Sequence, residues 1–230
     1  QGNDDLYVEM TFMKSMEKYG IDVSIRQAGI DFANTGYTLW AANRTGRRNL
    51  RFGIAPPASS HPRYSDNCDD IDYQIEADFS GIIAPGMLNV PVEMGEKFGR
   101  LMNYGDGMYG GQFVGAMYAA AYFEDDVKIV IETALGCIPQ ESDYAACVRD
   151  VIAWYEANPD DWKATWRLIE ENYHNSFEHQ KFAKIHDSWI PIDAKLNGAY
   201  IVLGLLYGEG DMEKTMKISM QGGKDSDCNP

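Results

Sequence analysis

Apolar residues recur every three or four positions through most of the chain, and this spacing limits the fold more than any other feature of the sequence. One run places apolar side chains at Tyr144, Val148, Val151, Ile152 and Tyr155. The same spacing defines further expected helices over residues 6–16, 162–173, 196–207 and 211–216. A face that repeats with this period predicts an amphipathic α-helix. No stretch alternates between apolar and polar residues between hairpin turns, so the sequence predicts an all-α, multi-helical domain.

Two of the expected helices have features of their own. Near the N-terminus, one helix is expected to end at Gly20, a residue suited to the position after a helix. Its broad apolar face is expected to consist of Leu6, Met10 and Met13, with Val8, Phe12 and Met16 beside them. The segment 107–123 is rich in glycine and alanine. A helix with such a small-residue surface can pack closely, so we expect it at the centre of the domain.

The stretch from Asn43 to Asp70 is expected to be a long loop inside a single domain that spans residues 1–230, because glycine, proline and serine are frequent in it. It carries five arginines of an otherwise acidic chain, namely Arg44, Arg47, Arg48, Arg51 and Arg63. Arginine binds anionic groups through paired hydrogen bonds, so one interpretation is an anion or phosphate clamp. The other is a solvated loop that balances nearby carboxylates. After this loop, residues 71–79 are expected to form a capped helix.

The charge balance excludes some partners. The chain has 35 acidic and 20 basic residues and a formal net charge of −15. Such a surface repels phosphate backbones, so we expect no nucleic-acid partner. The longest uncharged run, 107–123, is too short and too polar to cross a bilayer, so we expect no membrane span. The sequence leaves the oligomeric state open.

The cysteines and the two ends of the chain bear on its context. The four cysteines form no CxxC pair, and they are either all free or include a Cys137–Cys147 bridge. The chain begins with neither an initiator methionine nor a signal peptide. Both ends are typical of the interior of a longer protein, so we expect flanking segments at each end. A cytoplasmic and a periplasmic location both stay open.

Three groups of carboxylates lie where helices are expected to begin or loops to run. They are Asn3-Asp4-Asp5, the stretch 69–78, and Asp225-Ser226-Asp227-Cys228. Carboxylates gathered without basic partners repel one another, and a hard divalent cation such as Mg²⁺, Mn²⁺ or Ca²⁺ relieves this repulsion. Helix capping by aspartate is the alternative explanation. We interpret the second group as part of the capped helix expected over residues 71–79 rather than as a calcium loop.

Taken together, these motifs resemble the ADP-ribosylglycohydrolase family, which includes enzymes that remove ADP-ribose from an arginine of dinitrogenase reductase. Asn3-Asp4-Asp5 is similar to the family's Thr/Ser-Asp-Asp motif at a helix start. Asp225-Ser226-Asp227-Cys228 is similar to its Gly-Asp-x-Asp-Thr motif near the C-terminus. The segment 78–85 is similar to its Asn-Gly-Ala-x-Met-Arg-x-x-Pro segment, and 103–106 resembles its Thr-His segment. The resemblance covers nearly the whole chain in the expected order.

The resemblance implies an all-helical fold and a metal-dependent glycosidic hydrolase that cleaves an ADP-ribosyl or related glycosidic bond. It implies two Mg²⁺ or Mn²⁺ ions, with Ca²⁺ as a further candidate. The implied metal ligands are Asn3, Asp4, Asp5, Asp225, Asp227 and Cys228. Asp4 and Asp5 are also the implied catalytic residues, because one of them positions the attacking water. The implied substrate-binding residues are Asp78, Gly81, Tyr104, Asp106 and Tyr109.

The sequence departs from the family at several positions. Asn3 replaces the Thr or Ser ligand, Cys228 replaces a Thr, and the histidine and arginine of the two middle motifs are not found. The family's Gly-Asp-x-x-Gly…Glu motif would lie upstream of this chain. These changes favour two alternatives: a hydrolase of the same fold that acts on a glycan or another ribosylated small molecule, and a catalytically silent member that binds metal and ligand only.

Overall fold

The computed structural model describes residues 3–174 and 192–230, and within this part of the chain it contains eleven α-helices and no β-strand. This confirms the all-α prediction. The helices are α1 (Asp4–Tyr19), α2 (Ile25–Ala33), α3 (Ala41–Arg51), α4 (Asp78–Ile82), α5 (Asn89–Lys97), α6 (Asp106–Ala120), α7 (Val127–Leu135), α8 (Asp143–Ala157), α9 (Trp162–Ile169), α10 (Ala194–Gly208) and α11 (Met212–Gly222). Shorter helical turns cover Ala58–Ser60, Gln74–Glu76, Gly99–Leu101 and Glu170–His174.

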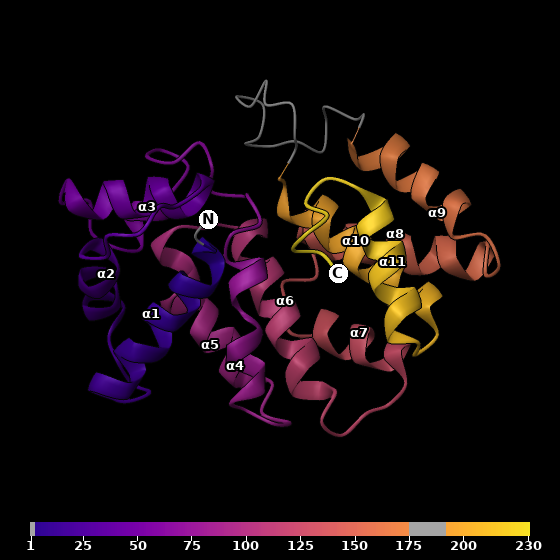
Figure 1. Ribbon diagram of the computed structural model, residues 1–230, viewed down its shortest axis with the longest axis horizontal. Coiled ribbons are helices and arrows are strands. Elements are labelled where there is room, and N and C mark those ends of the chain that lie inside the picture. Colours follow the sequence, from indigo (N-terminus) through magenta and orange to yellow (C-terminus); the bar gives the residue numbers. More distant parts are fainter. Residues whose placement is uncertain (1–2, 175–191) are drawn as a thin grey trace.

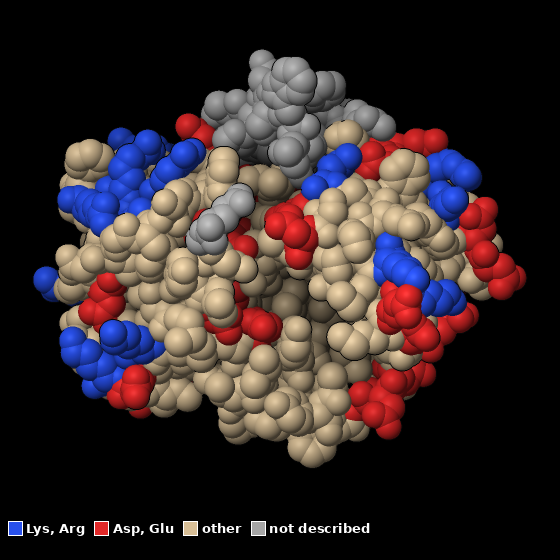
Figure 2. Space-filling model, in the orientation of Figure 1, with Lys and Arg blue, Asp and Glu red and all other residues tan. Residues whose placement is uncertain are grey.

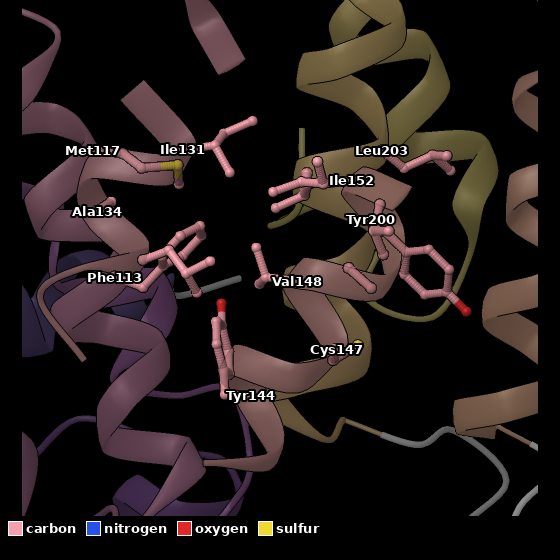
Figure 3. Packing of buried hydrophobic residues seen from close by; sticks show 14 of the residues in the cluster. Phe113, Met117, Ile131, Ala134, Tyr144, Cys147, Val148, Ile152, Tyr200 and Leu203 are labelled. Carbon is pink, nitrogen blue, oxygen red and sulfur yellow. The ribbon is translucent and has the colours of Figure 1, made fainter. Parts of the chain in front are cut away.

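The helices form two halves that lie side by side. Figure 1 shows α1 to α5 on one side, α7 to α11 on the other, and α6 between them. Each half has its own core. In the first half, the ring of Phe12 lies against those of Phe32, Phe79 and Phe98. In the second half, side chains from α6, α7, α8 and α10 point toward one another (Figure 3). Among them, Phe113 lies 5.5 Å from Tyr144 between ring centroids.

Polar residues immediately before the helices explain where many of them begin. At these positions a side-chain oxygen accepts a hydrogen bond from a backbone N–H group of the first turn, which has no partner inside the helix. The residues that cap α-helices in this way are Asn3, Ser24, Asp126, Ser142, Asp161, Asp193 and Asp211. The predicted starts of the helices after Asp161 and Asp211 are therefore confirmed.

The central helix α6 has the small-residue surface that the sequence predicts. Gly81 of α4 lies so close to α6 that a methyl group there would overlap the carbonyl oxygen of Gly115. One turn earlier on the same side of α6, Gly111 contacts the ring of Tyr73, a residue of the first core. These glycines let α6 pack at short distance against the first half of the molecule.

Two predictions about the first half of the chain are right only in part. In α1 the predicted broad apolar face is buried at Val8 and Phe12, and Met13 packs against the core, whereas Leu6 and Met10 are 51% and 53% exposed. The side of this face that carries Phe12 therefore packs against the core, and the side that carries Leu6 and Met10 points to solvent.

The predicted loop 43–70 is also partly helical, because α3 covers its first nine residues. The buried face of α3 consists of small and polar residues, so it gives no apolar periodicity. Gly46 lies against the backbone of Leu101, and the amide of Asn49 donates hydrogen bonds to the carbonyl oxygens of Ser59 and Tyr64, each at 2.8 Å.

Two further expectations have clear outcomes. The expected helix 71–79 is instead the short turn Gln74–Glu76 followed by α4. All four cysteines are free, so the Cys137–Cys147 bridge is not formed. Within the described ranges, no helix is both long and apolar enough to cross a membrane.

Candidate metal centre

The two acidic motifs at opposite ends of the sequence meet in the structure. The thiol of Cys228 lies 3.6 Å from the Oδ2 atom of Asp5, although 223 positions separate the two residues. In Figure 1 the start of α1 and the segment after α11 accordingly lie on the facing sides of the two halves. The junction between the halves thus carries both motifs.

A tight turn after α11 shapes the C-terminal motif. Gly223 ends the helix at a φ of +96°, and Lys224 follows at +60°. The buried side chain of Asn197 in α10 then holds the turn, because its Oδ1 atom accepts hydrogen bonds from the backbone N–H of Asp225 at 3.2 Å and from the amide of Asn229 at 2.8 Å. The sequence analysis did not identify Asn197. Its place near the start of a predicted helix gave no signal that a distant loop depends on it.

The turn brings Asp225, Asp227 and Cys228 together, with one potential ligand atom of each within 4.8 Å of the other two. Burial, together with the neighbouring Asp227 and Asp5, raises the pKa of Asp225 to about 6. Burial and the charge of Asp4 likewise raise the pKa of Asp5 to about 6. The two motifs therefore repel each other when both are ionised.

The residues at this junction fit a hard divalent cation. Three aspartates supply carboxylate oxygens, the ligand type that Mg²⁺, Mn²⁺ and Ca²⁺ prefer. A cation also compensates the repulsion that raises the pKa of Asp5 and Asp225. The thiol of Cys228 is a poorer ligand for these cations than the three carboxylates. Burial raises the pKa of the thiol far above its usual range, and these cations prefer oxygen to sulfur.

The other residues of the N-terminal motif have partners in the fold. The Oδ1 atom of Asn3 accepts the backbone N–H of Leu6 at 3.2 Å and so caps α1. The Oδ2 atom of Asp4 accepts the backbone N–H of Trp40, immediately before α3, at 2.8 Å. Helix capping therefore explains Asn3, whereas Asp5 faces the C-terminal motif.

Two buried carboxylates next to this junction had no assigned role in the sequence analysis. Asp72 accepts the backbone N–H of Asn43 at 2.9 Å, and Glu76 accepts the side-chain amide of Asn43. Burial raises the pKa of Asp72 to about 7 and that of Glu76 well above its usual range, with Asp5 among the charges that raise both. Both residues fall in the stretch 69–78, for which the sequence predicts a capped helix and no site.

A cavity of about 520 Å³ adjoins the junction, bounded by Asp78 on one half and Cys228 on the other. Figure 2 shows a hollow between the two halves with acidic residues at its border. Tyr118 of α6 and the carboxylates of Glu124 and Asp125 also line the cavity. This is a concave space of the size that small-molecule sites occupy.

The remaining predicted substrate-binding residues are not gathered at this cavity. Gly81 is buried against α6 close to Tyr118. Asp106 opens α6 and accepts the backbone N–H of Tyr144 at 3.1 Å, and Tyr104 lies beside His61 with 5.1 Å between ring centroids. At 1.5 Å per residue, about 18 Å of helix separates Asp106 from Tyr118. Tyr109, half-buried one turn after Asp106, belongs to that same distant end.

A pair of carboxyl groups shares a hydrogen bond at the cavity wall. Glu9 of α1 is bonded to Asp78, and burial together with the charge of Asp78 raises the pKa of Glu9 to about 7. A hydrogen bond between two carboxyl groups requires one proton, so Glu9 stays protonated over part of the neutral range.

Replacing Glu9 with Gln is expected to raise the Tm at alkaline pH. The folded-state pKa of Glu9 lies above its ordinary value of 4.5, so its stabilising proton is lost as the pH rises through about 7. Gln stays neutral and avoids this loss. Melting curves of both proteins across the pH range test this prediction: the Tm values should coincide in acid and diverge in base. A difference that does not change with pH would contradict it.

Replacing Asn197 with Ala is expected to weaken binding of Mg²⁺ by about 10- to 100-fold, the usual effect of losing a residue that orients metal ligands. The reason is that the turn carrying Asp225 loses the acceptor of its hydrogen bonds. The concentration of Mg²⁺ that gives half of the maximal rise in Tm measures the effect. Asn172→Ala is the control, since the exposed amide of Asn172 donates a hydrogen bond to the carbonyl oxygen of Leu168 in its own helical turn. Equal half-maximal concentrations for Asn197→Ala and wild type would contradict the prediction.

One comparison with known proteins gives a match, to a protein family. A model of the ADP-ribosylglycohydrolase family matches residues 1–230. No curated protein and no solved structure gives a significant match. Proteins of this family are hydrolases, are generally metal-dependent and act on ADP-ribosylated substrates. With a family match over its full length, an all-helical fold and both acidic motifs brought to one junction, this chain belongs to the ADP-ribosylglycohydrolase family.

Proposed function

We propose that the protein is a metal-dependent glycosidic hydrolase that cleaves an ADP-ribosyl or related glycosidic bond. The observation that carries this proposal is the 3.6 Å contact between Asp5 and Cys228, which unites the two acidic motifs beside a cavity. The family match supports the hydrolytic class. The substrate and the metal dependence are our inference from the junction.

In this proposal Asp5, Asp225 and Asp227 hold one or two divalent ions, with Asp4 as a further ligand. Bound divalent cations lower the pKa of a coordinated water and polarise substrate oxygens. Asp4 and Asp5 are the catalytic residues, and their carboxylates orient the attacking water and accept its proton. Asn3 and Cys228 lie next to these ligands, as a helix cap and a thiol neighbour of Asp5.

The cavity would receive the substrate on the side of Asp78. The shared proton of Glu9 and Asp78 can be donated to an oxygen or nitrogen atom of a bound glycoside. Gly81 would act indirectly, because its close contact with α6 fixes the position of α4, which carries Asp78. Tyr104, Asp106 and Tyr109 would contact only a longer substrate, one that extends along α6 to its first turn.

One observation favours the alternative in which the substrate is a glycan or another ribosylated molecule without a diphosphate. Among the described residues that line the cavity, none is Lys or Arg, whereas Asp78, Glu124 and Asp125 are acidic. Acidic walls repel a diphosphate and accept a neutral or cationic group. A nucleoside-like glycoside therefore fits these walls better than intact ADP-ribose.

Turnover assays separate the candidates. The protein is incubated with an ADP-ribosyl-arginine peptide, with nitrophenyl ribofuranoside and with a panel of nitrophenyl glycosides, each with Mg²⁺, with Mn²⁺ and with EDTA. Metal-dependent release from the first substrate supports the ADP-ribosyl reaction, and release only from the others supports the alternative. Turnover that persists in EDTA would contradict metal dependence. Absence of turnover on every substrate, despite a metal-dependent rise in Tm, would favour a silent ligand-binding member.

A further inference from the structure

Four exposed residues form a stripe along α3, which we call the α3 stripe. They are Trp40, Arg44, Arg48 and Phe52, spaced four positions apart: Arg44 and Arg48 are neighbours on the surface of α3, and Trp40 and Phe52 are the residues immediately before and after the helix. The two aromatic side chains at its ends are 70% and 78% exposed. Large exposed aromatics beside arginines are unusual on a surface that contacts only water, because aromatic residues and arginine are enriched where proteins bind one another.

The other two arginines of α3, Arg47 and Arg51, form hydrogen bonds with the backbone of the preceding segment. Arg47 donates a hydrogen bond to the carbonyl oxygen of Tyr37 at 2.7 Å, and Arg51 donates one to that of Ala33 at 2.7 Å. These contacts fix the connection between α2 and α3. Within the described part of the chain, no carboxylate forms an ion pair with Arg44 or Arg48. Two like charges four positions apart on a helix repel each other, so folding alone does not account for this pair.

The α3 stripe begins at the candidate metal centre. The backbone N–H of Trp40 donates to the Oδ2 atom of Asp4 at 2.8 Å. With a rise of 1.5 Å per residue, the stripe extends about 18 Å from Trp40 to Phe52. Figure 2 shows basic side chains gathered over α3, whereas acidic residues border the hollow between the two halves. A partner on this stripe would therefore reach the metal centre with one end.

The shape and charge of the α3 stripe indicate the kind of partner. Small ligands bind in concave sites, whereas the outer face of a helix is convex and suits a macromolecule. Two arginines flanked by aromatics match carboxylates and apolar side chains of a polypeptide, and such residues supply much of the binding energy at protein interfaces. Nucleic acid fits less well, because the chain has a net charge of −15 and the stripe leads into a group of carboxylates.

We propose that the α3 stripe is a docking surface for an acidic polypeptide segment, which Arg44 and Arg48 bind through its carboxylates and Trp40 and Phe52 through apolar contacts. That this segment belongs to the protein carrying the scissile bond rests on the proposed function. The docking itself does not, since it requires neither metal nor turnover.

The test is a binding measurement with fluorescence anisotropy. The probe is a fluorescein-labelled, glutamate-rich peptide that carries tyrosines, titrated with wild type and with the double variant Arg44→Glu/Arg48→Glu. We expect the variant to bind at least about tenfold more weakly, and Trp40→Ala to bind several-fold more weakly. The matched control is Lys14→Glu/Lys18→Glu, which makes the same charge change at the same spacing on the exposed face of α1.

Each outcome of the binding measurement either supports or overturns the proposed docking surface. Wild-type affinity in the control, together with the loss in the α3 variants, supports it. Equal losses in both double variants would show a general effect of net charge and overturn it, as would unchanged binding of Arg44→Glu/Arg48→Glu. Tighter binding of a labelled oligo-uridylate than of the peptide would replace the polypeptide by nucleic acid and also overturn it. The binding measurement can be interpreted even if the turnover assays find no activity, so each of the two proposals can be rejected without the other.

Discussion

Asp225→Asn is expected to abolish both hydrolysis and the rise in Tm that Mg²⁺ produces, while it raises the Tm of the metal-free protein at alkaline pH. Burial and the neighbouring carboxylates raise the pKa of Asp225 from 3.8 to about 6 in the folded protein. The stability associated with its proton is therefore present in acid and is lost as the pH rises through about 6. Asparagine carries no charge and removes this cost, but it also removes a ligand.

The expected size of the metal effect is large. At a Mg²⁺ concentration about 100-fold above Kd, binding to the native state adds about 2.7 kcal/mol to the free energy of unfolding. For a domain of this size, that corresponds to a rise in Tm of about 8 °C. Melting curves of wild type, Asp225→Asn and Asp5→Asn in EDTA and in Mg²⁺ measure it. Asp160→Asn, which changes an exposed aspartate, is the control. A variant at Asp225 that keeps the full rise in Tm would exclude this residue from the metal site.

Gly81→Ala is expected to destabilise the protein strongly, although it adds only one methyl group to α4. The added Cβ would overlap the carbonyl oxygen of Gly115 and the backbone nitrogen of Ala119, both in α6. Backbone atoms cannot rotate away, so α4 and α6 must separate. Overpacking of this kind costs about 3 kcal/mol, which outweighs the higher helix propensity of alanine.

The measurement is thermal or denaturant unfolding, with an expected fall in Tm of about 10 °C. Gly36→Ala is the matched control, because a Cβ there meets no atom within 4 Å. If Gly81→Ala has the stability of wild type but loses substrate binding, the packing explanation fails and Gly81 contacts substrate as the family resemblance implies. The two readings of Gly81 are thus separated by one variant.

The sequence predicted those parts of the fold in which a helix buries apolar side chains at regular spacing. The run from Tyr144 to Tyr155 lies in α8, and the aspartates before α9 and α11 cap them as expected. Helix α3 was not predicted, because its buried face consists of alanine, asparagine, threonine and glycine and so shows no apolar periodicity. The predicted face of α1 was too broad, because only tertiary packing, such as that of Phe12 against Phe98, selects which of its apolar residues are buried.

At the junction too, the sequence predicted the residues that belong to a local motif and missed those whose role depends on distant contacts. The two acidic motifs were visible as sequence patterns, and the resemblance to the family related them to each other. The roles of Asn197, Asp72 and Glu76 depend on contacts between segments far apart in the chain, which no local pattern records. Glu9 is a comparable case, since its proton depends on Asp78 in another helix.

A crystal structure of the protein with Mn²⁺, in which anomalous scattering locates the ion, tests the proposed metal centre most directly. We expect one or two anomalous peaks between α1 and the turn after α11, at about 2.0–2.6 Å from carboxylate oxygens. Those oxygens should belong to Asp5 and to Asp225 or Asp227. Peaks bound to the C-terminal turn alone, or no peak at this junction at saturating Mn²⁺, would contradict the claim that the two ends of the chain form one metal centre.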